Sequence, residues 1–169
     1  MMQVMPDKKW IFDTAALSNF LLSESISILE KRYRKRAIIT WEVYDEIAAG
    51  MREYSLLKDV DKLIDNNIFQ LVSLSRKEHK NYLDLIGHLG KGEASCIAFA
   101  QAHSAIVVTD DRTARKQCTS MKILLTGTIG ILKASQLDGH ISLSQADEIL
   151  LKMRNAGFYS PVRSISDIS

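Results

Sequence analysis

Two segments of this 169-residue sequence place carboxylates directly after a short apolar run. Asp13 follows the run Trp10 to Phe12. Asp110 and Asp111 follow, after one threonine, the run Ala105 to Val108. If both runs are strands of one parallel sheet, their acids lie at the same edge, because the carboxyl ends of parallel strands meet there and open α/β sheets place their ligands at that edge. A cluster of acids there predicts a bound divalent cation.

Two further acids stand where a helix begins or packs toward the same edge. Glu46 lies on a helical segment after the second apolar run, and Glu93 follows Gly-Lys-Gly in a first helical turn, where the helix dipole favours a carboxylate. Carboxylates gathered within a few Å repel each other and need compensating charge. Mg²⁺ or Mn²⁺ suits an acid cluster with few histidines better than zinc does. Such a centre supports attack of water on a phosphodiester, so the predicted reaction is phosphodiester hydrolysis.

Other phosphoryl chemistry also uses acids at a sheet edge, but its patterns are missing from this sequence. A signalling receiver requires an acidic pair after its first strand and a lone acceptor Asp after its third, whereas Asp13 stands alone and residues 71–75 contain no acid. A phosphatase with an Asp-x-Asp nucleophile is disfavoured because Ala15 stands two residues after Asp13.

Apolar and amphipathic patterns alternate along the chain, and the elements that they predict position the acids. Strands are predicted at residues 10–12, 37–39, 69–74, 106–108 and 123–125. Helices are predicted around them, among others at residues 13–22, 41–49, 78–89, 93–103, 128–137 and 145–155. Strands that alternate with helices indicate an α/β fold, a three-layer α/β/α sandwich with a parallel sheet covered on both faces.

Composition limits the possible classes of protein. With 46% hydrophobic residues, we expect one domain over residues 1–169. A charged fraction of 25% and a net charge of +2 exclude a basic nucleic-acid tail and a disordered acidic segment. Cys96 and Cys118 lack CxxC spacing, residues 1–6 are too short for a signal peptide, and no apolar run approaches the ~20 residues of a membrane span. We therefore expect a cytoplasmic protein without a membrane segment.

Cations follow the second acidic junction. Arg112, Arg115 and Lys116 are placed to bind RNA phosphates, although they could instead only balance the charge of the acids. Thr128 stands among glycines between a strand and a helix, where backbone amides can also bind phosphate. The segment 31–36 holds five cations in six residues, which could track an RNA backbone, but a solvated helix end whose cations face outward is the preferred interpretation.

Four segments, taken in order, resemble the acidic motifs of PIN-domain ribonucleases. They are IFDTAALSNF around Asp13, VYDEI around Glu46, GKGEASCIAFA around Glu93 and VVTDDRTAR around Asp110 and Asp111. The later segment LLTGTIGILKASQLDGHIS and the final amphipathic helix resemble a PIN subgroup related to the toxins of VapBC-type toxin–antitoxin pairs. The resemblance therefore covers nearly the whole chain.

This resemblance implies a Rossmann-like, five-stranded parallel sheet with the first and fourth strands adjacent, and cleavage of RNA with Mg²⁺ or Mn²⁺. Asp13 and Glu93 would be the main metal ligands, Asp111 or Asp110 would complete the site, and Glu46 would orient the water. The implied partners are RNA, a small antitoxin that lays a helix in the groove, and a second copy in a homodimer. Glu93 stands where many members carry Asp, so the alternative is a weak or inactive PIN-like scaffold that binds RNA or a protein without cutting.

Overall fold

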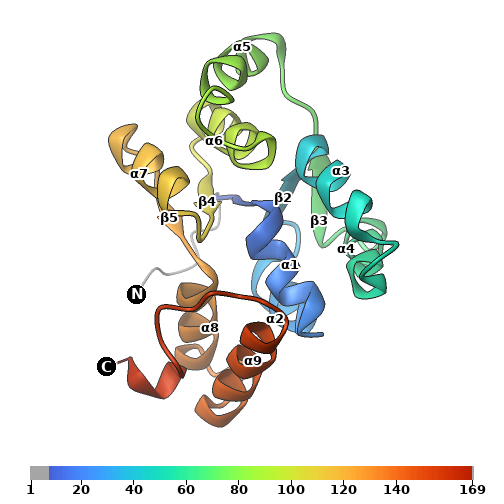
Figure 1. The fold of residues 1–169 in the computed structure, drawn as a ribbon, viewed down its shortest axis with the longest axis vertical. Helices are drawn as coiled ribbons and strands as arrows, with labels where there is room; N and C mark the ends of the chain where they lie inside the picture. The colour runs from blue at the N-terminus through green and yellow to red at the C-terminus, as the bar shows by residue number, and fades with distance from the viewer. Residues whose placement is uncertain (1–7, 169) are drawn as a thin grey trace.

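The computed structural model describes residues 8–168, and within that range five parallel strands form one sheet in the order β3-β2-β1-β4-β5 (Figure 1). The strands are β1 (Trp10–Phe12), β2 (Ala37–Thr40), β3 (Phe69–Val72), β4 (Ile106–Val108) and β5 (Leu125–Thr126). The first and fourth strands are neighbours, with Phe12 opposite Val108. The predicted five-stranded parallel sheet is therefore confirmed. Residues 1–6, for which no signal peptide is predicted, lie outside the described residues.

Helices cover both faces of this sheet. They are α1 (Thr14–Leu22), α2 (Ile26–Tyr33), α3 (Trp41–Gly50), α4 (Asp59–Asp65), α5 (Arg76–Leu85), α6 (Lys91–His103), α7 (Arg112–Ser120), α8 (Thr128–Leu137) and α9 (Leu143–Asn155), with short 3₁₀ turns η1 (Ser55–Lys58) and η2 (Ile165–Asp167). Helix α6 packs on β1, β2 and β4 between α5 and α7, whereas α1 packs against α9, which also contacts α8. Figure 1 shows these two groups on opposite sides of the strands, as the predicted three-layer sandwich requires.

The chain leaves β1 and β4 toward opposite edges of the sheet. From β1 it continues to β2 and then β3, and from β4 it continues to β5. Neighbouring parallel strands whose connections diverge in this way leave a crevice at their carboxyl ends, where open α/β sheets bind ligands. Asp13 directly follows β1, and Asp110 follows β4 after one residue. The topology thus places both acids at the same crevice.

Aromatic packing fixes the end of β1 that carries Asp13. All three residues of β1 are buried. The Phe12 ring lies against the rings of Phe69 and Tyr33, with centroid distances of 5.1 and 5.7 Å. Buried aromatic pairs add about 0.5–1.5 kcal/mol beyond the area that they bury. The strand end is therefore held rigidly by side chains from β3 and α2.

Several boundaries differ from the predictions because capping side chains and tertiary contacts set them. The strand predicted at residues 123–125 lies two residues later, as β5. The helix predicted at residues 78–89 begins at Arg76, since the Ser75 hydroxyl accepts a hydrogen bond from the Glu78 amide (3.2 Å). The last helix begins at Leu143, because Ser142 and Gln145 form a capping box.

Arg32 corrects the interpretation of the basic segment 31–36. That segment was expected to expose its cations, but Arg32 is only 4% exposed. Its guanidinium donates to the Tyr33 hydroxyl (3.0 Å) and forms an ion pair with Asp138 at the end of α8. A buried cation requires such partners. Arg32 therefore ties α2 to α8 and is not available to a ligand.

None of the helices in the described part of the chain has the length and hydrophobicity that crossing a membrane requires.

Candidate metal centre

Asp13 sits where β1 ends and α1 begins. Its backbone amide donates to the Val108 carbonyl of β4 (3.0 Å), and its Oδ1 accepts a hydrogen bond from the Ala16 amide (2.8 Å). The second bond is the N-cap of α1, a role that suits Asp. Capping uses only one carboxylate oxygen. Oδ2 is buried and accepts no hydrogen bond from any residue between 8 and 168.

A buried, charged carboxylate oxygen without a hydrogen-bond partner costs folding free energy, and the pKa of Asp13 reflects this cost. Burial, together with the nearby negative charges of Asp110 and Glu93, raises the pKa of Asp13 from 3.8 to about 7. The hydrogen bond from the Ala16 amide and the polar Thr109 side chain beside Asp13 oppose this rise. Three acids from distant parts of the chain therefore act on one another at the crevice. A cation beside Oδ2 would favour the ionised form.

Asp110 is held by the start of α8. Its Oδ1 accepts from the Thr128 amide (2.9 Å) and its Oδ2 from the Thr128 hydroxyl (2.5 Å). The Asn19 amide group of α1 also reaches Oδ2 (3.4 Å) and the Thr128 hydroxyl (3.1 Å). Because α8 presents its N-terminus, the positive end of the helix dipole favours this carboxylate. Asp110 is thus positioned from both α1 and α8.

Asp111 and Glu93 form the outer part of the acidic group. Asp111 is the N-cap of α7, with its Oδ2 accepting from the Ala114 amide (2.8 Å). Glu93 lies in the first turn of α6, half-buried. Burial raises the pKa of Glu93, and the charges of Asp111 and Glu46 raise it further. The sequence left open which aspartate of the pair lies at the site. In the structure the charge of Asp110 raises the pKa of Asp13, whereas the charge of Asp111 raises the pKa of Glu93.

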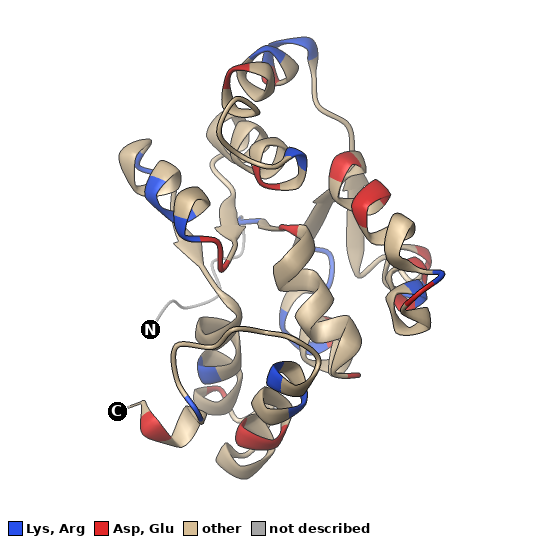
Figure 2. Ribbon diagram, in the orientation of Figure 1, with Lys and Arg blue, Asp and Glu red and all other residues tan. Residues whose placement is uncertain are grey.

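Glu46 reaches the same group from α3. Its Oε1 accepts a hydrogen bond from the Thr14 hydroxyl in the first turn of α1. A Cβ built on Gly92 would collide with this Glu46 oxygen and lie 2.9 Å from the Thr14 hydroxyl. The missing side chain at Gly92 therefore lets α3, α1 and α6 approach one another here. In Figure 2, acidic segments on α3 and at the starts of α1, α6 and α7 lie around the same central region of the fold.

The residues present fit a hard cation held by few protein ligands. Within residues 8–168, no group of three or more His, Cys, Asp or Glu side chains is arranged to hold a metal ion. Mg²⁺ is usually held by one or two carboxylates together with waters and substrate phosphates, so it does not need such a group. The Asp13 Oδ2, which accepts no hydrogen bond from the described residues, and the nearby carboxylate of Glu93 offer this kind of donor set.

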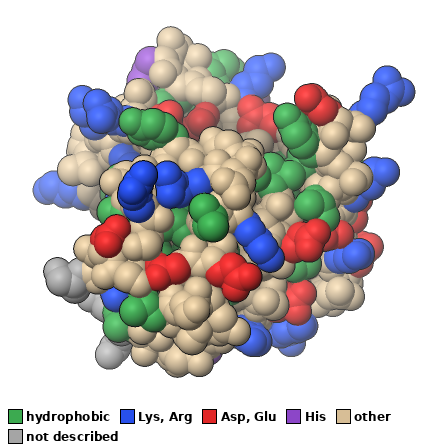
Figure 3. All heavy atoms as spheres, turned by 60° about the horizontal axis from the view of Figure 1, so that its bottom comes forward, with side chains coloured by type: hydrophobic (Ala, Val, Ile, Leu, Met, Phe, Trp, Pro, Cys, Tyr) green, Lys and Arg blue, Asp and Glu red, His purple; other side chains and the backbone are tan. Residues whose placement is uncertain are grey.

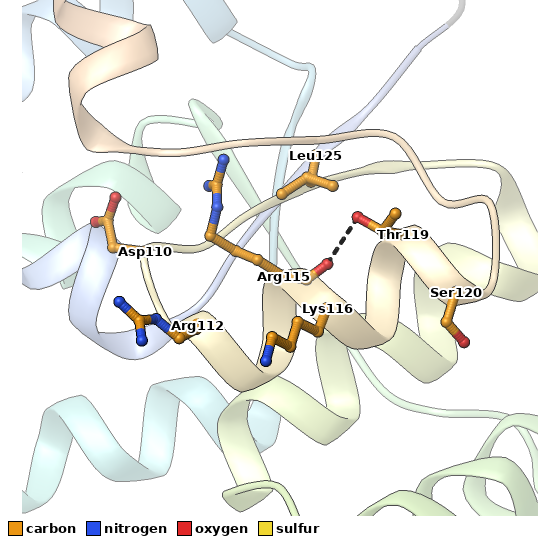
Figure 4. A pocket seen from close by; sticks show the side chains of 7 residues that line it. All are labelled: Asp110, Arg112, Arg115, Lys116, Thr119, Ser120 and Leu125. Carbon is orange, nitrogen blue, oxygen red and sulfur yellow. Dashed lines mark hydrogen bonds between the residues drawn. The ribbon is translucent and has the colours of Figure 1, made fainter.

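Cations line a cavity of about 650 Å³ that begins at Asp110. Arg112, Arg115 and Lys116 are exposed on α7. Figure 4 shows Arg112 and Lys116 on one side of this helix and Arg115 extending on the other, near Leu125. On the face seen in Figure 3, basic and acidic side chains are interleaved. The cations of α7 that line this cavity create local positive character beside Asp110.

Thr128 is buried, whereas an RNA-binding residue was expected to be exposed. It is fully buried, and both its amide and its hydroxyl donate to Asp110. The position at the start of α8 was predicted correctly, but the side chain turns inward because Asp110 needs donors. It leaves no exposed surface for RNA to contact.

Three polar residues were missed by the sequence analysis: Thr14, Asn19 and Thr109. Thr14 donates to Glu46, Asn19 to Asp110 and Thr128, and the fully buried Thr109 hydroxyl accepts from the Asp111 amide (3.1 Å). Asn19 carried one usable signal, since it is a polar residue amid the apolar positions Phe20 and Leu21 of a short helix. Thr14 and Thr109 carried none beyond standing next to an acid.

Comparisons with known proteins bear on the fold and the family. PAE2754 from Pyrobaculum aerophilum, whose crystal structure is known, is 16% identical to this chain, with a TM-score of 0.49 over 75% of this chain and 88% of that one. No curated protein matches the sequence. A family model described as DUF3368: PIN domain matches residues 9–169. PIN domains are in general metal-dependent nucleases. Because the match spans nearly the whole sequence, this protein belongs to the PIN-domain family DUF3368.

Proposed function

We propose that this protein is a metal-dependent endoribonuclease that hydrolyses RNA phosphodiester bonds with Mg²⁺ or Mn²⁺. The observation that carries the proposal is the buried Oδ2 of Asp13, which lacks a hydrogen-bond partner among the described residues and lies within the electrostatic reach of Asp110 and Glu93. Family membership supports nuclease chemistry in general. The acids supply the specific reason for a divalent cation, because they combine unsatisfied negative charge with carboxylate oxygens.

Each acid has a proposed role. Asp13 and Glu93 would hold the cation, with Asp110 and Asp111 completing its surroundings. A divalent cation bound there supplies neutralising charge and lowers the pKa of water. Glu46, which accepts a hydrogen bond from the Thr14 hydroxyl, would orient the attacking water and accept its proton. Asn19 and Thr128 keep Asp110 directed at the crevice.

The substrate side of the proposal depends on the cations of α7. Arg112, Arg115 and Lys116 would hold phosphates next to the acids, since they line the cavity that starts at Asp110. Arg115 is the best positioned, because its guanidinium donates to the Thr109 carbonyl (2.7 Å) and is thereby fixed against the strand end. Fixed guanidinium groups bind phosphate oxygens with good geometry.

The finer parts of the proposal come from the resemblance to VapC-type toxins. We propose a single domain over residues 1–169 that acts in the cytoplasm as the toxin of a toxin–antitoxin pair, with a small antitoxin as partner and a homodimer as its assembly. A small open reading frame beside the gene would support the antitoxin. The second candidate, a scaffold that binds RNA without cutting, is favoured by Glu93 standing where many family members carry Asp.

Glu93→Gln tests whether the acid group performs the cleavage. Wild-type protein is expected to cut RNA with Mg²⁺ or Mn²⁺ and to stop in EDTA. The Gln variant should cut at least about 100-fold more slowly, because it loses a charged ligand of the cation. Initial rates on a labelled single-stranded RNA measure this.

The matched control is Glu148→Gln, which removes an exposed carboxylate from α9. It should cut like wild type. Equal cutting by wild type and Glu93→Gln would point to a contaminating nuclease or another site. RNA binding without any cutting by the wild type would favour the scaffold.

Gly92→Ala tests the position of Glu46. The added Cβ would collide with the Glu46 carboxylate, whose flexible end can swing away at little cost to folding. We expect the rate of RNA cleavage to fall about tenfold to 100-fold, since misplacing a catalytic group by 1 Å has effects of this size. The melting temperature should fall only slightly, because the better helix propensity of Ala partly offsets the cost of moving the Glu46 and Thr14 oxygens.

Gly87→Ala is the control for this substitution, since a Cβ there meets nothing within 4 Å. It should leave both the rate and the melting temperature unchanged. An undiminished rate in Gly92→Ala would show that the position of Glu46 does not matter to the reaction.

A further inference from the structure

Tyr159 is 94% exposed, the highest value among the large hydrophobic side chains of residues 8–168 that lie at the surface. It follows α9 in the segment that leads to η2. The chain turns before it at Gly157, which has a φ of +113°. Phe158 then packs against the hydrophobic core, and Tyr159 points away from it. An aromatic ring is thus placed in solvent at a point where its neighbour is anchored.

The backbone around Tyr159 is held on both sides. The Phe158 amide donates to the Met153 carbonyl of α9 (3.0 Å). After Tyr159, the Ser160 hydroxyl donates to the Val162 carbonyl (2.6 Å), and Ile165 is completely buried. These contacts fix where the ring is presented, which lowers the conformational entropy that a binding partner must remove.

Tyr159 faces a cavity of about 430 Å³ that extends to Asp110 and Arg115. Pro161 and Phe158 line the cavity on the Tyr159 side, and the glycine turn before α8 lines it on the other. Volumes of this order are typical of small-molecule sites. The larger cavity of α7 shares Asp110, Arg115 and Leu125 with it. The two cavities therefore adjoin at these three residues, and together they line a path from Asp110 past Arg115 to Tyr159.

We propose that Tyr159 stacks against an unpaired base of the RNA next to the cleaved phosphate. This proposal rests on the proposed ribonuclease function and defines its substrate as single-stranded at that position. A strand that leaves the acids would place a phosphate at Arg115 and its base on the Tyr159 ring. Proteins that bind single strands combine cations along the backbone with aromatic rings under the bases, and every base has a face that can stack.

A nucleic acid suits this path better than a protein segment does. The cavity beside Tyr159 is also lined by Arg115, and the cations Arg112 and Lys116 line the adjoining cavity. A strand with one phosphate per nucleotide and an apolar face on each base matches alternating cationic and aromatic contacts.

The experiment measures the affinity for a labelled single-stranded oligoribonucleotide by fluorescence anisotropy in EDTA, where cleavage does not interfere. Tyr159→Ala is expected to weaken binding by about tenfold or more. Tyr159→Phe retains the ring and should bind like wild type. Tyr54→Ala, which removes another exposed tyrosine (51% exposed) near α3, should also bind like wild type. Binding to a fully paired RNA duplex should be the same for all variants.

A second readout localises the contact. Single 5-iodouridines along the oligonucleotide are irradiated, and the crosslinked residue is identified by mass spectrometry. A crosslink to Tyr159 from a position next to the cleavage site is expected. Unchanged affinity in Tyr159→Ala, or crosslinks only elsewhere, would overturn the proposal and leave the ring for a protein contact, while cleavage by the wild type would still uphold the ribonuclease. A wild type that neither binds nor cuts RNA would overturn both.

Discussion

Asp13→Asn is expected to lower RNA cleavage by at least about 100-fold while raising the stability of the metal-free protein at pH 8. The cleavage falls because the variant loses a carboxylate oxygen that is buried at the crevice and accepts no hydrogen bond from the described residues. The stability rises because a buried negative charge disappears from beside Asp110 and Glu93. Asn caps helices as well as Asp does, so α1 keeps its N-cap.

The size of the stability gain follows from two opposing terms. Removing the charge is worth up to roughly 4 kcal/mol, from a pKa that burial raises from 3.8 to about 7. The new amide N–H group has no acceptor, which costs about 1–3 kcal/mol. We expect a net gain of about 1–3 kcal/mol in urea unfolding in EDTA.

Asp84→Asn is the matched control, because Asp84 is exposed on α5. It should change neither cleavage nor stability. In Asp13→Asn the rate of RNA cleavage must fall while the free energy of unfolding rises. A variant that loses both activity and stability would indicate that Asp13 acts mainly in folding, and a variant that keeps its activity would remove Asp13 from the site.

The stability of metal-free wild-type protein is expected to depend on pH through the same carboxyl group. Between pH 4 and pH 7 the folded protein keeps a proton on Asp13 that the unfolded chain has released, since its pKa is about 7 when folded and 3.8 when unfolded. Stability therefore falls as the pH rises through this window, because the folded state binds more protons. The full change attributable to Asp13 is roughly 4 kcal/mol and levels off above pH 7.

The difference in unfolding free energy between wild type and Asp13→Asn reports this contribution together with its coupling to Asp110 and Glu93, because titrating groups that do not interact with Asp13 affect both proteins equally. Measured in EDTA, the difference should grow from pH 4 to pH 7 and then stay constant. With Mn²⁺ or Mg²⁺ in excess the wild type should gain stability as the pH rises, since ligands must be deprotonated to bind a cation. A difference that does not vary with pH in EDTA would show that Asp13 is already ionised at low pH in the folded protein.

The sequence by itself determined the parts of this protein that depend on neighbouring residues. Apolar runs followed by an acid, at residues 10–13 and 105–111, predicted β1 and β4 with their acids, and the alternation of elements predicted the α/β/α sandwich. Local patterns suffice there because side-chain periodicity and capping act over a few residues. The same patterns missed the bounds of β5, which begins at Leu125, and of α5, which follows its Ser75 cap and ends at Leu85.

Only the tertiary structure decided what surrounds each acid. The pKa of Asp13 depends on burial and on the charges of Asp110 and Glu93, which are distant in sequence. The division between Asp110 and Asp111 depends on where the start of α8 lies, and Arg32 turned out to be buried because Asp138 reaches it. The role proposed for Tyr159 depends on the cavity that its segment shares with Asp110 and Arg115. Desolvation and Coulomb interactions depend on distance in space, which one-dimensional patterns do not encode.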